Sequence, residues 1–164
     1  MVDALLSNTT GKESHGEYYK LLRSAEMKGI STDPEKLQQF TDQAFSYITA
    51  FGGKLNAQDY QTFARRGGAA FMNADIGKSM GPLSVLMADL GGSAAGTAAM
   101  TLHQFITGAG VLSKQQFEVM KQAGLLNEGG FTDLGGRINI KPGGILARIM
   151  QRFDGYGALG AALV

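Results

Sequence analysis

The chain has 164 residues, of which 44% are hydrophobic and 18% are charged. It has the size of one domain, with or without a tail, and it is too apolar for an intrinsically disordered protein. Lys plus Arg number 15 and Asp plus Glu number 14, a balance that argues against strong nucleic-acid binding by the chain as a whole. The absence of cysteine excludes disulfides, thiolate metal sites and cysteine nucleophiles, and two histidines are too few for a histidine-rich metal site.

Helix start and stop signals divide the first half of the chain. Three segments each carry a capping residue, an apolar stripe at helical spacing and a terminal glycine. They predict helices over residues 14–29, 33–52 and 56–67. At the first of them, Ser14 and Glu17 have the spacing of a capping box.

The middle of the chain predicts three further helices. The segment 69–78 lacks periodicity and is predicted to be irregular or a short turn of helix. Pro82 and Ser93 are the expected starts of the next two helices, because proline favours the first turn and serine caps it. Gly91–Gly92 separates them, and a last helix is expected over residues 113–124.

The end of the chain changes in character. Residues 127–164 are rich in glycine, although 137–141 alternates like a short strand or hairpin and 145–153 suggests a last short helix. We therefore expect an all-α fold: a compact bundle of five to seven short helices over 1–126, followed by a mostly irregular extension. The chain ends on an apolar run, from which we expect that the natural polypeptide continues or that a partner covers this end.

One uncharged stretch, residues 90–112, is long enough to span a bilayer. Polar and small residues fill nearly half of it, which favours a helix packed inside a soluble bundle over membrane association. In the favoured interpretation, small residues allow a neighbouring helix to approach closely. These residues are Gly91, Gly92, Ala95, Gly96 and Ala99.

The ionisable side chains form no recognisable acid–base pair. Four acids, Glu17, Glu26, Glu35 and Asp42, fall on helix faces or near helix starts, where solvated charges and acids that match the helix dipole belong, so a structural role is expected for each. Asp89 and His103 lie among apolar residues and are expected to be a polar-face acid and a packing histidine. The basic clusters, expected to be solvated or to contact a partner, are Arg65, Arg66, Arg137 and Lys141. The sequence thus predicts no catalytic residue, no cofactor and no metal.

Four motifs, in order, resemble a region of tailed-phage tape measure proteins. They are "FARRGG" (63–68), "LMADLGGSAAGTA" (86–98), "LSKQQFEVMKQAGLL" (112–126) and the glycine-flanked "INIKPGGI" (138–145). The resemblance spans residues 55–145, a little over half of the chain.

This resemblance implies a structural role rather than an enzyme. Members of the family fill the lumen of the growing tail tube, and their length sets the length of the tube. The implied partners are the tail tube protein, the tail chaperones and other copies of the chain, with no nucleic acid bound by this segment. The implied location is the virion tail, and the bacterial cytoplasm during assembly. Family members are far longer, so this chain would be an excerpt or a prophage remnant.

Two alternatives remain open. The first is an all-helical, lysozyme-like peptidoglycan hydrolase with a lone catalytic glutamate, for which the candidates are Glu17, Glu26 and Glu118. The second is a membrane-active segment centred on residues 92–110.

Overall fold

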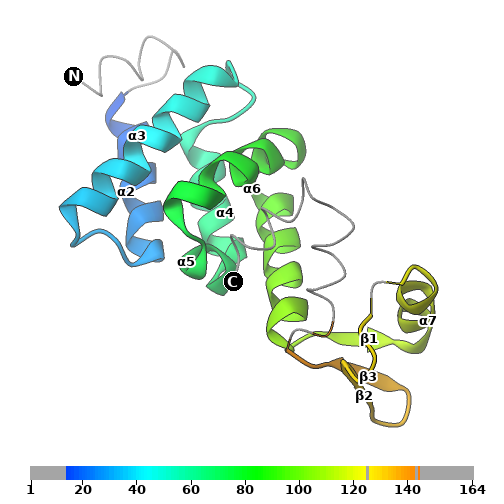
Figure 1. The fold of residues 1–164 in the computed structure, drawn as a ribbon. Coiled ribbons are helices and arrows are strands. Elements are labelled where there is room, and N and C mark those ends of the chain that lie inside the picture. Colours follow the sequence, from blue (N-terminus) through cyan, green and yellow to red (C-terminus); the bar gives the residue numbers. More distant parts are fainter. Residues whose placement is uncertain (1–13, 125, 143, 145–164) are drawn as a thin grey trace. The chain divides into compact units, whose positions relative to one another are not determined.

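The computed structural model describes residues 14–124, 126–142 and 144. Their contacts divide the chain into two compact units, Met1–Met100 and Thr101–Val164, which are described separately (Figure 1). Helices make up most of the structure, which confirms the predicted fold class, with one small sheet added. The division at residue 100 differs from the boundary expected at residue 126. A strand at residues 111–113 pairs with one at 137–140, so the residues on both sides of position 126 belong to the same unit.

The first unit is built from consecutive helices. They are α2 (Ser14–Lys28), α3 (Pro34–Ala50), α4 (Ala57–Gly67), α5 (Ala69–Asn73) and the first part of α6 (Ile76–Thr107). The three helices predicted in the first half of the chain are confirmed. Local caps explain the starts of α3 and α4: the Asp33 side chain accepts the backbone N–H of Lys36, and Asn56 and Asp59 form a reciprocal capping box.

The predicted start of the next helix at Pro82 is wrong. The helix α6 begins at Ile76, and Pro82 lies inside it. Asp75 explains the earlier start, because its carboxylate accepts the backbone N–H of Lys78 at 2.8 Å and its carbonyl accepts the N–H of Ser79. The segment 69–78 was expected to be irregular or a short turn of helix; α5 fits the short turn, and the capping acid Asp75 starts a longer helix after it.

The helix α6 is interrupted at Gly91, as the glycine pair predicted. Gly91 has φ 77° and ψ 153°, a backbone conformation that glycine adopts without strain. The expected cap at Ser93 is wrong, because Ser93 lies within the second part of α6. The carboxylate of Asp59 on α4 instead accepts the N–H of Gly92 at 3.2 Å.

Aromatic rings fill the centre of the first unit. Phe40 packs edge-to-face on both Tyr60 and Phe71, with ring centroids 6.2 Å apart in each pair. Phe63 completes the cluster against Phe71 at 5.6 Å. The buried hydroxyl of Tyr60 lies 2.6 Å from the hydroxyl of Ser84, so the one polar group among these rings is satisfied. This cluster joins α3, α4 and α5 to one another.

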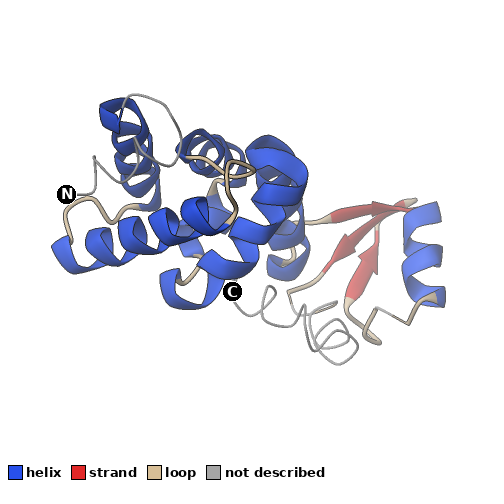
Figure 2. Cartoon of the chain, turned by 90° about the horizontal axis from the view of Figure 1, so that it is seen from above, coloured by secondary structure: helices blue, strands red, loops and turns tan. Residues whose placement is uncertain are grey.

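The second unit contains a three-stranded antiparallel sheet with α7 (Lys114–Gln122) beside it (Figure 2). The strands are β1 (Val111–Ser113), β2 (Phe131–Asp133) and β3 (Arg137–Ile140), and β3 lies in the centre. The predicted strand near 137–141 is confirmed, and it pairs with a second strand, β2, that the sequence did not predict.

The turn between β2 and β3 explains why glycine-rich sequence forms a hairpin here. Gly135 and Gly136 have φ values of 70° and 101°, which other residues rarely adopt. The carboxylate of Asp133 accepts the N–H of Gly136 at 3.1 Å. Glycine in this segment therefore serves a tight turn between paired strands.

Two further sequence predictions concern the uncharged stretch 90–112, which is long enough to span a bilayer, and the helix expected over residues 145–153. Among the described residues, no helix combines the length and apolarity needed to cross a bilayer. The helix predicted over 145–153 lies outside the described residues.

Candidate functional site

The small residues of α6 lie directly against the backbone of α4. A Cβ atom on Gly92 would overlap the carbonyl oxygen of Asp59 and lie 2.7 Å from its Cα atom. A Cβ atom on Gly96 would lie 2.9 Å from the carbonyl oxygen of Phe63 and 2.7 Å from the Cβ of Arg66. Because both separations are shorter than any normal carbon contact, only glycine permits this approach of the two helices.

The remaining small residues named from the sequence divide into two kinds. Ala95 and Ala99 are fully buried, on the same side of α6 as Gly92 and Gly96. Gly91 does not pack in this way, since nothing lies within 4 Å of the position of its Cβ and its role is the backbone break. The structure therefore brings four of the five residues into one buried face.

Polar side chains gather at the N-terminus of α4, where this helix meets α6. A helix leaves its first four N–H groups without intrahelical acceptors. Here all four are bound: Asn56 N–H by the Asp59 carboxylate, Ala57 N–H by the Glu17 carboxylate, and the N–H groups of Gln58 and Asp59 by the Asn56 side chain. Asp59 also binds Gly92 N–H, so one carboxylate caps two helix starts.

Glu17 has a structural role, but it is buried rather than solvated. Glu17 is only 2% exposed, and its carboxylate accepts hydrogen bonds from Lys20 at 2.8 Å and from the N–H of Ala57 at 3.2 Å. One of these partners, Ala57, lies 40 residues further along the chain, where spacing along the sequence could not identify it. An ionised carboxylate is stable at this depth because a cation and a helix N-terminus both neutralise it.

An open hollow of about 740 Å³ borders the contact between α4 and α6. Asp59, Thr62 and Leu90 line it, together with the outward-facing small residues Ser93, Ala94, Thr97 and Ala98. Leu90 is 53% exposed, a large apolar side chain at the rim of an accessible surface. The hollow thus combines small outward-facing residues with one large exposed apolar side chain at its rim.

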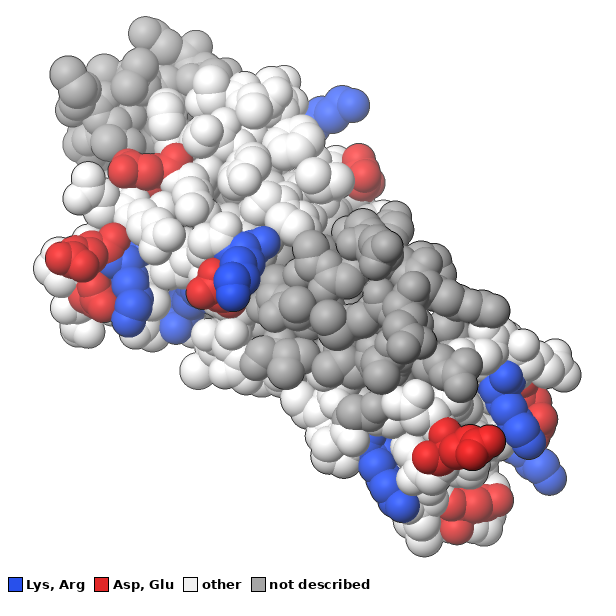
Figure 3. All heavy atoms as spheres, viewed as in Figure 1, with Lys and Arg blue, Asp and Glu red and all other residues white. Residues whose placement is uncertain are grey.

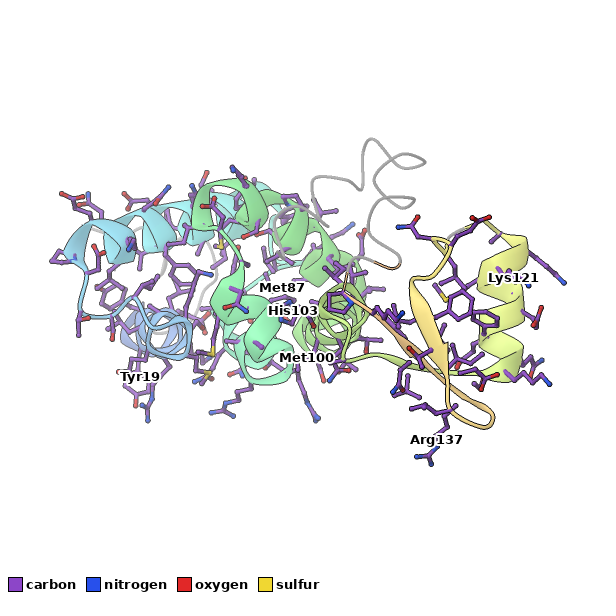
Figure 4. All side chains as sticks on the ribbon, turned by 60° about the horizontal axis from the view of Figure 1, so that its bottom comes forward. Tyr19, Met87, Met100, His103, Lys121 and Arg137 are labelled. Carbon is purple, nitrogen blue, oxygen red and sulfur yellow. The ribbon has the colours of Figure 1, made fainter. Side chains whose placement is uncertain are left out.

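The basic residues named from the sequence are all exposed. Arg65 and Arg66 lie in the last turn of α4, whereas Arg137 lies on β3 and Lys141 follows it. The two pairs belong to different units, and Arg137 points away from the sheet (Figure 4). On the face shown in Figure 3, acidic and basic side chains are interspersed, which is not the continuous basic surface that binds nucleic acid.

The two polar residues that the sequence placed in apolar helices differ in exposure. Asp89 is exposed and His103 is buried, as expected from their helices. No group of three or more His, Asp or Glu side chains gathers into a potential metal site within residues 14–124, 126–142 and 144.

Comparisons with known proteins add no family. No family model, curated protein or solved structure matches this chain. Function is therefore inferred from the residues, their contacts and the order of their motifs.

Sequence reasoning missed one buried ion, Lys28. It is 7% exposed, and its ammonium donates hydrogen bonds to the carbonyl oxygens of Phe71 and Ala74 at the end of α5. The ammonium also lies 4.8 Å from the ring centroid of Phe71. Burial lowers its pKa to about 8, although the charge of Asp75 raises it. The only sequence signal was a basic residue directly before the glycine that ends α2.

Lys28 makes stability depend on pH in a defined direction. Its pKa is about 8 in the folded chain and ordinarily 10.5, so between these values the unfolded chain binds more protons. The free energy of unfolding should therefore rise from pH 8 to 9.5, by about 1 kcal/mol, as the cost of burying the charge disappears. Urea denaturation at both pH values measures this rise.

The comparison with two variants isolates Lys28 from other titrating groups. Lys28→Met should abolish the rise, whereas the exposed Lys54→Met should retain it. The measurement stops at pH 9.5 because burial raises the pKa of Tyr60. At higher pH tyrosine ionises in the unfolded chain before it does in the folded chain, which lowers the free energy of unfolding. Equal slopes in the parent and in Lys28→Met would show that Lys28 is not the titrating group.

Proposed function

We propose that this chain is a helical module of a phage tail tape measure protein, which acts by contacts with other proteins. The observation that carries the proposal is the direct contact between two motifs on which the resemblance depends. Gly96 of "LMADLGGSAAGTA" packs on Phe63 and Arg66 of "FARRGG", at a distance that excludes any other residue. The motifs resemble the family in sequence, and they also form a single packing unit.

The use of the charged side chains supports a structural role. Asp59 and Glu17 cap the start of α4, and Lys28 binds the carbonyl oxygens at the end of α5. These three ions thus hold helix ends, as expected of a structural module. The partners that we propose are the tail tube protein, the tail chaperones and other copies of the chain, inside the virion tail and in the host cytoplasm during assembly.

The lysozyme-like hydrolase is the second candidate, and the surroundings of its three glutamates disfavour it. Glu17 is buried and occupied, as described above. Glu26 is exposed and paired with Arg23 at 2.7 Å, and Glu118 is exposed on α7. An acid catalyst of this kind lies in an apolar pocket, whereas Glu26 and Glu118 are exposed.

An in-frame deletion tests the proposed function. In the phage or prophage that encodes the chain, removal of residues 14–144 should shorten the tails or prevent their assembly, since tape length sets tube length. Electron microscopy of purified particles measures tail length. Normal tails of unchanged length would contradict the proposal. Clearing of purified peptidoglycan by the intact chain, lost in Glu26→Gln or Glu118→Gln, would establish the hydrolase instead.

A further inference from the structure

The break in α6 depends on a backbone conformation that only glycine adopts readily. Gly91 is the one residue inside α6 with non-helical angles, φ 77° and ψ 153°, and this combination is essentially restricted to glycine. Nothing lies within 4 Å of the position of its Cβ, so packing against Gly91 does not impose the conformation. Glycine adopts helical angles as well, so residue 91 permits both an interrupted and a continuous α6.

A different helix supplies the hydrogen bond that accompanies the break. In a continuous α6 the N–H of Gly92 would donate to the carbonyl oxygen of Ala88, four residues earlier. In the structure this N–H donates to the carboxylate of Asp59 on α4 at 3.2 Å. The interrupted form of α6 is therefore stabilised from outside the helix, by an ionised acceptor.

The part of α6 after the break packs on α4 through small residues. Gly92 and Gly96 lie against the backbone of α4, and Ala95 and Ala99 are buried on the same side. Hydrophobic stabilisation increases with the apolar area removed from water, so glycine and alanine contribute less to this contact than larger side chains would. The contact is close in distance, but it buries little apolar surface for each residue.

The part of α6 before the break is held in another way. Met80, Leu83 and Met87 are buried there, and the hydroxyl of Ser84 lies 2.6 Å from that of Tyr60. The aromatic cluster at the centre of the unit lies on α3, α4 and α5, so it includes no residue beyond the break. Residues 92–100 can therefore separate from α4 while the first part of α6 keeps its own core contacts.

We propose that α6 exchanges between two states, with Gly91 as the hinge. In the interrupted state, the Asp59 carboxylate binds the N–H of Gly92 and residues 92–100 pack on α4. In the continuous state, Gly91 is helical, Gly92 donates to Ala88 and the small residues of α6 are uncovered. The position of one N–H thus determines whether this face is buried or accessible. The inference does not rest on the proposed function.

A distance measurement in the full chain tests the proposal. The sequence contains no cysteine, so spin labels can be attached at Arg65→Cys on α4 and Ala98→Cys on α6, two exposed positions. Double electron–electron resonance should give one short distance in the labelled parent. Gly91→Ala should add a longer distance and raise its population by about tenfold or more, because alanine is strained in the interrupted state and favours helix.

The matched control is Gly53→Ala. Gly53 also has a positive φ, 93°, and open space around the position of its Cβ, but it lies outside any helix. The same substitution there carries a backbone penalty without a helix to continue, so the labels should keep the short distance. A longer distance in Gly53→Ala as well would assign the effect to general destabilisation and overturn the proposal.

A second variant acts from the opposite helix. Asp59→Ala removes the acceptor of the Gly92 N–H and should also populate the longer distance, whereas Asp89→Ala, which removes an exposed acid from α6, should not. The short distance alone in both Gly91→Ala and Asp59→Ala would refute the exchange.

Chemical shifts distinguish a continuous helix from local unfolding. In Gly91→Ala, the carbon-13 shift of the Cα atom of residue 91 should move into the helical range, and the helical circular dichroism signal should be retained. A longer distance accompanied by random-coil shifts at residues 91–100 would show that this part of α6 unfolds, which would also overturn the proposal.

Discussion

Gly92→Ala is expected to lower the free energy of unfolding by about 3 kcal/mol or more. The added methyl group would overlap the backbone of Asp59, and backbone atoms cannot move aside as a flexible side chain can. The two helices would have to separate, which would also break the hydrogen bond from Gly92 N–H to the Asp59 carboxylate. Chemical denaturation followed by circular dichroism measures the loss.

The matched control for this prediction is Gly16→Ala. Gly16 is an exposed glycine inside α2, with nothing within 4 Å of the position of its Cβ. The same substitution there should stabilise the chain by about 0.5–1 kcal/mol, because alanine favours helix and restricts the unfolded chain. If Gly92→Ala were as stable as the parent, the helices would not be in backbone contact.

Asp59→Ala is expected to lower the free energy of unfolding by about 2–3 kcal/mol. The substitution removes the acceptor of two N–H groups that lie 36 residues apart, those of Asn56 and Gly92. Both helix starts would lose a cap at once. Hydrogen exchange distinguishes the loss of these caps from a general loss of stability. With the caps lost, the exchange rate of the Gly92 amide should increase more than that of other amides.

Two further variants limit the interpretation of this result. Asp59→Asn keeps one oxygen acceptor and should recover part of the lost stability. Asp89→Ala removes an exposed acid from α6 and should change stability by less than about 0.5 kcal/mol. Equal losses from Asp59→Ala and Asp89→Ala would mean that the shared cap has no energetic value.

These stability variants also bear on the proposed function. Under the proposed function the chain acts as a packed unit, so the Gly92 and Asp59 variants should impair tail assembly in proportion to their loss of folded protein. The Gly16 variant, with the same type of substitution, should assemble normally.

The starts of several helices could be predicted because they depend on neighbours in the sequence. Asp33 caps α3 three residues ahead, and Asn56 and Ser113 begin capping boxes whose second members are also three residues away. Glycine marked the break at Gly91 for a similar reason, since its backbone freedom is a property of the residue itself. Such signals are complete within one turn of helix.

The tertiary structure alone decided the partners of the ions and the pairing of the strands. Glu17 accepts an N–H from a residue 40 positions away, and Asp59 accepts one from a residue 33 positions away. Strand β1 pairs with β3, although α7 and β2 lie between them in the sequence. Spacing along the sequence identifies Glu17 and Asp59 as acids near helix starts, but it cannot say which helix start each one caps. That choice depends on which surfaces pack together, because a buried charge takes whichever partner the folded chain brings within hydrogen-bond distance.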